Sequence, residues 1–87
     1  MNMQRFRQVL QYIEARPDEW IQRSTNRCFI GTTVFLCGAV GDWNDWDLAR
    51  IWLGIGVSPQ DWRLFDWISA SNRTLDDFRT VARRPFA

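Results

Sequence analysis

The spacing of apolar residues predicts a series of short helices. Between residues 3 and 16 an apolar side chain recurs every three or four positions, which places these side chains on one side of a helix and the arginines and glutamines on the other. The apolar positions are Met3, Phe6, Val9, Leu10 and Ile13. Pro17 ends this helix, because a proline disfavours helical backbone in the residue before it. A proline followed by two acids over residues 17–20 is typical of one further helical turn.

The segment 28–37 is the most apolar part of the chain, and it has no clear period. Its β-branched and aromatic residues favour a strand by propensity. The rest of the sequence offers no second strand, however, and an unpaired strand would leave its backbone groups unsatisfied. We therefore predict a buried central helix that is capped by Ser24 or Thr25 and ends near Gly38 or Gly41.

Capping residues predict three more helices. Asp42 is expected to cap a helix over residues 43–53, which Gly54 ends. Ser58 is followed by a proline and then by Asp61, an order that predicts a capping box. A threonine and an aspartate at positions 74 and 77 repeat this pattern before the last helix.

The positions of these helices that we expect to face the core are Trp46, Ala49, Trp52, Leu53, Trp62, Phe65, Ile68, Leu75, Phe78, Val81 and Ala82. A chain of 87 residues buries one small core, so we expect a single domain over residues 1–87. The sequence therefore predicts an all-α fold, a small bundle of about five short helices.

Composition argues against several functions. The 11 basic residues are all arginine, and with 10 acidic residues they leave a formal net charge of +1, which argues against a protein that coats nucleic acid. Because the chain has no histidine, a catalytic pair of a nucleophile and a histidine cannot form. We expect no enzyme activity, no metal and no cofactor.

The two cysteines and the apolar runs bear on the location of the protein. Cys28 and Cys37 are nine positions apart, which on a helix or a strand places them too far from each other for a disulfide. This fits a reduced, cytoplasmic setting. No apolar run approaches the length of a membrane span, so we expect no membrane association.

Several short motifs follow one another along most of the chain. They are Arg16-Pro17-Asp18-Glu19-Trp20, Cys28-Phe29-Ile30-Gly31 with Val34, Leu36 and Gly38, Ala49-Arg50-Ile51-Trp52-Leu53-Gly54-Ile55, Leu64-Phe65, and Thr74-Leu75-Asp76-Asp77-Phe78. This order resembles a family of small uncharacterised proteins of actinobacteria and their phages, which have a C-F-A-G-W-A-V-x-L-x-G core and a T-L-D-D-L close. The resemblance implies the fold and a phage or bacterial origin, and it implies no known activity. Arg23 and Arg27 stand where the family often has a cysteine and a histidine, so it implies no thiol or metal chemistry here.

Six tryptophans are the least ordinary feature of the composition. A core of this size cannot easily hold six such rings, each of which also needs a partner for its indole N–H. Tryptophans alternate with acids over residues 42–47, and exposed tryptophan surrounded by charge is typical of protein-binding hot spots. The alternative is that these rings cover the edge of the core. The partner-binding surface that we predict consists of Asp42, Trp43, Asp45, Trp46, Asp47 and Trp67.

The predicted function is that of a small phage-type or bacterial accessory protein, which binds and modulates a host protein through this Trp/Asp surface. It would act in host takeover or in inhibition of a defence system, in the host cytoplasm if a phage encodes it. Two alternatives stay open: a homo-oligomer that binds a small anionic ligand such as a nucleotide, and a nucleic-acid binder that uses arginines. The candidate anion-binding residues are Arg5, Arg7, Arg23 and Arg27.

Overall fold

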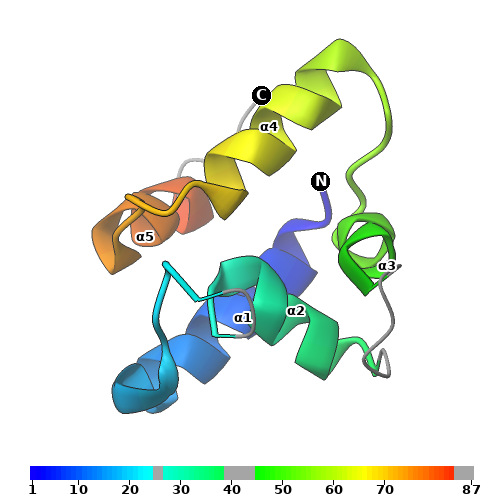
Figure 1. Ribbon diagram of the computed structural model, residues 1–87. Coiled ribbons are helices and arrows are strands. Elements are labelled where there is room, and N and C mark those ends of the chain that lie inside the picture. Colours follow the sequence, from blue (N-terminus) through cyan, green and yellow to red (C-terminus); the bar gives the residue numbers. More distant parts are fainter. Residues whose placement is uncertain (25–26, 39–44, 84–87) are drawn as a thin grey trace.

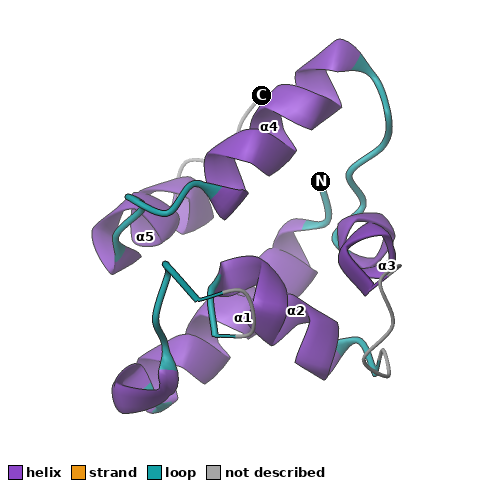
Figure 2. Cartoon of the chain, viewed as in Figure 1, coloured by secondary structure: helices purple, strands orange, loops and turns teal. Residues whose placement is uncertain are grey.

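The computed structural model describes residues 1–24, 27–38 and 45–83 (Figure 1). The helices are α1 (Met3–Ala15), α2 (Phe29–Leu36), α3 (Asp45–Trp52), α4 (Pro59–Ser69) and α5 (Leu75–Arg83), and a single 3₁₀ turn, η1 (Pro17–Glu19), follows α1. Figure 2 shows that all regular structure in the described ranges is helical, which confirms the predicted all-α fold. None of the described helices is both long and apolar enough to cross a bilayer.

Helix α2 lies at the centre of the molecule, in contact with α1, α3 and α4 (Figure 1). Residues 29–33 of this helix are all buried. This part of the helix is covered on every side and has no solvent-facing stripe, which explains why its sequence has no period. Phe35, further along the same helix, is 67% exposed. The prediction of a buried central helix is confirmed, and so is its end: Gly38, just after it, has a φ of +81°, a conformation that favours glycine.

Three phenylalanine rings form the middle of the core. Phe6 of α1, Phe29 of α2 and Phe78 of α5 are fully buried. The ring centroids of Phe29 and Phe78 are 4.5 Å apart in a stacked arrangement, and those of Phe6 and Phe29 are 4.7 Å apart. Trp20 and Trp67 then meet Phe78 edge-on, with centroid distances of 6.4 and 6.0 Å. The core is therefore aromatic, with rings from helices at both ends of the sequence.

The start of α2 differs from the prediction. Its N-cap is Cys28, whose Sγ accepts a hydrogen bond from the Gly31 amide at 3.3 Å. The predicted cap Ser24 accepts instead from the amide of Arg27 at 3.2 Å, and so stabilises a turn before the helix. The other predicted cap, Thr25, lies outside the described residues.

Gln22 is a buried polar residue that joins two helix ends. Its Nε2 donates to the carbonyls of Ile68 at 2.9 Å and Ala70 at 3.0 Å, at the end of α4. Its Oε1 accepts from the amide of Phe29 at 3.0 Å, at the start of α2. One side chain therefore satisfies backbone groups that would otherwise lack partners at both helix termini.

Helices α4 and α5 begin, and α3 ends, as their capping residues predict, whereas the predicted cap of α3, Asp42, lies outside the described residues. The Ser58 hydroxyl accepts from the amide of Asp61, and the Asp61 carboxylate accepts from the amide of Ser58, each at 3.2 Å. Thr74 and Asp77 repeat this reciprocal pair at 3.3 and 2.8 Å. Gly54, with a φ of +75°, ends α3 where the N-terminal segment comes so close that a Cβ would lie 3.0 Å from a backbone nitrogen. These three local predictions are confirmed.

We expect Gln22→Leu to lower the free energy of unfolding by about 3 kcal/mol, because the buried backbone groups of Phe29 and Ile68 lose their partner. Urea-induced unfolding followed by circular dichroism measures this. Gln11→Leu, on the exposed side of α1, is the matched control and should change the value by less than about 0.5 kcal/mol. Equal stability of the two variants would contradict the role given to Gln22.

The Ser58 hydroxyl donates to the Asp61 carboxylate at 2.6 Å, and this hydrogen bond holds the pKa of Asp61 below its ordinary value of 3.8. A carboxylate whose pKa is lowered by folding stabilises the fold above its unfolded pKa and loses this effect as the pH falls through its folded value. We therefore expect Asp61→Asn to lower the melting temperature at neutral pH but hardly at all at about pH 2. Thermal unfolding at both pH values tests this, with Asp66→Asn on the same helix as the control. A deficit of equal size at both pH values would refute it.

Candidate functional site

The structure describes the predicted Trp/Asp surface only in part. Asp42 and Trp43 lie outside the described residues, and α3 begins at Asp45. Trp46 and Asp47 lie on the first turn of α3, and both side chains are exposed. Within the segment 42–47, the structure therefore places the side chains of Trp46 and Asp47.

Trp46 and Trp62 flank Phe65, which closes the core at this end of the molecule. The ring centroids of the two tryptophans lie 6.2 and 6.1 Å from that of Phe65. The predictions that Trp46 and Trp62 face the core are wrong, since both lie at its edge against Phe65 with their side chains 36% and 42% exposed. Trp62 lies on the first turn of α4. Phe65, one turn further along the helix, already fills the position next to the core. The tryptophan covers that phenylalanine from outside.

Trp67 lies elsewhere on α4. Five positions separate it from Trp62, which turns its side chain by about 140° around the helix axis. Its ring meets Phe78 of α5 edge-on, and the guanidinium of Arg73 lies 4.5 Å from its centroid. The structure therefore places Trp67 against the α5 side of the core and does not bring it together with Trp46.

Helix α3 is apolar on its outer side as well as on its inner side. Ala49 and Leu53 are fully buried, whereas Leu48 and Ile51 are 48% and 59% exposed. Leu48 and Ile51 are three positions apart and on the far side of the helix from the buried pair. A helix that is apolar on both sides is normally covered on both. We call Asp47, Leu48 and Ile51 together the α3 surface; Leu48 and Ile51 could have been recognised by their helical spacing off the buried stripe. Trp46 projects about 160° away from Leu48 around the helix axis and lies against Phe65 instead.

Arg50, a buried residue of α3, fixes the position of the helix that carries the α3 surface. Its Nη1 donates to the carbonyls of Ile55 and Gly56, each at 2.8 Å, so the segment after α3 is fastened to the helix. The same guanidinium lies 5.4 Å from the ring centroid of Trp62, and its Nε is 3.7 Å from the carboxylate of Asp47. This buried arginine thus links α3, the following segment and the start of α4.

Two of the predicted anion-binding arginines contact the ends of other helices. Arg5 donates from Nη1 to the Trp52 carbonyl at 2.8 Å, and its guanidinium lies 4.9 Å from the Trp52 ring centroid. Arg7 donates from Nε and Nη2 to the Ala82 carbonyl at 3.1 and 2.9 Å. Carbonyls at helix C-termini lack intrahelical partners and carry partial negative charge, so both arginines stabilise the fold.

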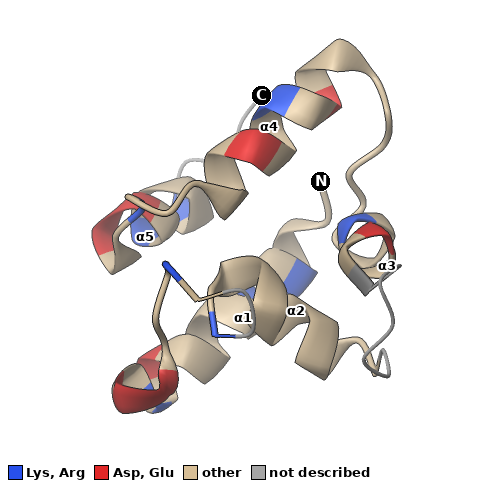
Figure 3. Ribbon diagram, viewed as in Figure 1, with Lys and Arg blue, Asp and Glu red and all other residues tan. Residues whose placement is uncertain are grey.

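The other two predicted anion-binding residues, Arg23 and Arg27, lie between η1 and α2 and are exposed. Arg27 lines a pocket, whereas Arg5 is engaged with α3 and Arg7 with α5. Figure 3 shows the basic positions of the described chain spread over several elements and interspersed with acidic ones. The structure therefore does not gather the four arginines into one anion site.

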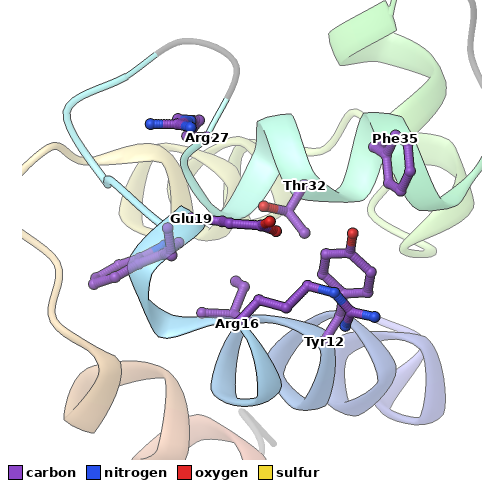
Figure 4. Close-up of a pocket in the computed structure, with 8 residues that line it drawn as sticks. Tyr12, Arg16, Glu19, Arg27, Thr32 and Phe35 are labelled. Atoms are coloured by element: carbon purple, nitrogen blue, oxygen red, sulfur yellow. The ribbon is translucent and has the colours of Figure 1, made fainter.

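The pocket has a volume of about 230 Å³ and lies between α1, η1 and α2 (Figure 4). It is lined by Tyr12, Ile13, Arg16, Glu19, Trp20, Arg27, Thr32 and Phe35. It thus combines aromatic walls with charges of both signs, and it includes no residue of the α3 surface.

Comparisons of this chain with protein-family models, curated proteins and solved structures gave no match. Within the described ranges, no group of three or more histidine, cysteine, aspartate or glutamate side chains is arranged to hold a metal ion. In the part of the chain that the structure describes, the α3 surface and the pocket are two features that bear on function.

We expect Arg7→Gln to lower the free energy of unfolding by about 1 kcal/mol, because the Ala82 carbonyl at the end of α5 loses both its charged donors. Urea denaturation measures the change, and Arg23→Gln, at an exposed position, serves as the control for loss of one positive charge. If the two variants are equally stable, Arg7 does not have the structural role described.

Proposed function

We propose that this chain is a small binding protein that attaches to a host protein through the α3 surface and modulates it, as in host takeover or inhibition of a defence system. The observation that carries the proposal is the exposure of Leu48 and Ile51 on a helix whose other side is already in the core. Removing a large aliphatic side chain from water contributes about 1.5–3 kcal/mol when it is complete. A partner that covers these half-exposed side chains gains a substantial part of that free energy.

The composition of the α3 surface supports a protein as the partner. It places two exposed aliphatic side chains, Leu48 and Ile51, beside the charge of Asp47, and Trp46, on another side of the same helix, is 36% exposed. Protein interfaces commonly have an aromatic and apolar centre with a polar rim. The hydrogen bonds of Arg50 keep this helix ordered before binding, which reduces the entropy that association costs.

Binding of nucleic acid receives less support. Such a protein needs a group of arginines that are free to contact phosphates. Arg5 and Arg7 donate to helix carbonyls instead. The described basic residues also lie among acidic ones (Figure 3), which lowers the positive potential of any one face.

The double variant Leu48→Gln with Ile51→Gln tests the proposal. We expect the amount of partner captured from a lysate of the host cell to fall at least about tenfold, because two apolar contacts at the centre of the interface are lost. Glutamine is a good helix former, and both sites are exposed, so the helical circular dichroism and the melting temperature should stay unchanged. Quantitative mass spectrometry of proteins retained by the immobilised chain gives the measurement.

Val57→Gln is the matched control, since Val57 is an exposed aliphatic residue outside α3. This variant should capture the same partner as the unmodified chain. Undiminished capture by the folded double variant would exclude the α3 surface as the binding site, and the absence of any partner retained by the unmodified chain would count against a host-protein ligand.

A further inference from the structure

The pocket between α1 and α2 is independent of the α3 surface, and its first wall is built by the end of α1. Pro17 forces Arg16 out of helical backbone, to φ −135° and ψ 56°. The Arg16 side chain then folds back over Tyr12, with its guanidinium carbon 4.0 Å from the ring centroid. No described acceptor takes a hydrogen bond from this guanidinium. Stacking leaves its N–H edge available for a planar anion such as a carboxylate.

The opposite wall contains a hydroxyl without a partner. Thr32 on α2 is only 9% exposed, yet its Oγ1 has no hydrogen bond to any described residue. The adjacent Thr33, by contrast, donates from Oγ1 to the Phe29 carbonyl at 2.8 Å, as a threonine in a helix can. The hydroxyl faces the pocket and has no partner among the described residues, so it can donate to or accept from a ligand there. Figure 4 shows Thr32 and Glu19 pointing toward one another across the pocket.

The charges of the pocket select for a ligand that carries both signs. Arg16 and Arg27 supply two guanidinium groups, and Glu19 supplies a carboxylate. No ion pair joins these side chains among the residues that the structure describes. A simple anion would be repelled by the Glu19 carboxylate, and a simple cation would be repelled by the guanidinium groups of the arginines. A zwitterion can pair with Glu19 through its cationic group and with Arg16 through its anionic group.

The remaining lining sets the size and the body of the ligand. Phe35 is largely exposed at the rim, with its ring centroid 5.9 Å from that of Tyr12, and Ile13 and Trp20 add apolar surface. The volume of about 230 Å³ is below the range of drug-sized sites, about 300–1,000 Å³, which indicates a single small molecule. An apolar side chain would fill the space between the rings.

We propose that this pocket binds a free amino acid with an apolar side chain. The ligand ammonium group is held by the Glu19 carboxylate and the Thr32 hydroxyl. Its carboxylate group is held by Arg16, on the far side of the pocket from Arg27 (Figure 4), and its side chain lies against Phe35 and Tyr12.

Titration of the isotopically labelled chain with L-phenylalanine, followed by two-dimensional NMR, tests the proposal. We expect saturable shifts at the amides of Tyr12, Arg16 and Thr32, with a dissociation constant of about 1 mM. N-acetyl-phenylalanine lacks the ammonium charge, and phenylalanine amide lacks the carboxylate charge. Each analogue should bind about tenfold more weakly, because one wall of the pocket is left without its partner.

Variants assign each charge to its wall. Glu19→Gln should remove the preference for phenylalanine over the N-acetyl analogue, and Arg16→Gln the preference over the amide. Asp18→Asn, next to Glu19 but outside the pocket lining, should leave both preferences intact. The double variant at Leu48 and Ile51 should still bind, which separates this proposal from the one made for the α3 surface.

Two results would overturn the assignment: the absence of saturable shifts at the pocket amides, or equal binding of phenylalanine and both analogues to the unmodified chain. Both results come from the unmodified chain, so a substitution that fails to fold leaves the test intact.

Discussion

The stacking of Phe29 on Phe78 determines how the helices of this protein are arranged. It fixes the central helix α2 against the last helix, and Phe6 adds the first helix to the same group of rings. Three phenylalanines fill the middle of a core this small, so tryptophan rings reach only its edge. Trp20 and Trp67 meet Phe78 edge-on, and neither is fully buried. The size of the core is thus the reason why aromatic surface is left on the outside of the molecule.

Features that depend on near neighbours in the sequence could be predicted. The period of α1 and the capping box of Ser58 and Asp61 involve residues within one or two turns of each other. The helix over residues 29–36 has no such period; its prediction rests on a segment that is apolar on nearly every side and on the lack of a second strand to pair with it. Gln22 could not have been identified, because its acceptors at Ile68 and Ala70 are 46 and 48 positions away and become neighbours only through packing.

The same distinction applies to the candidate sites. The exposure of Trp46 could be predicted, because the argument that six tryptophans exceed what a small core can bury depends only on the size of the core. Trp62 was assigned to the core wrongly, since helical spacing tells on which side a residue lies but not how far along the helix the core extends. The hydrogen bonds of Arg5 and Arg7 could not be predicted, because their acceptors are backbone carbonyls at the ends of distant helices, and no sequence pattern identifies these. The pocket, similarly, needs the backbone change at Arg16 and a hydroxyl from another helix.

Helix α2 is the element that the two proposed sites share. One part of it forms a wall of the pocket through Thr32 and Phe35, and another part packs against α3. Residues 29–33 are buried on all sides, and densely packed interiors do not deform continuously. Its first turn is also held by Gln22 and Cys28. A small molecule in the pocket would therefore meet a rigid wall, and filling the pocket should leave the α3 surface in place, so the two sites are expected to bind their ligands independently.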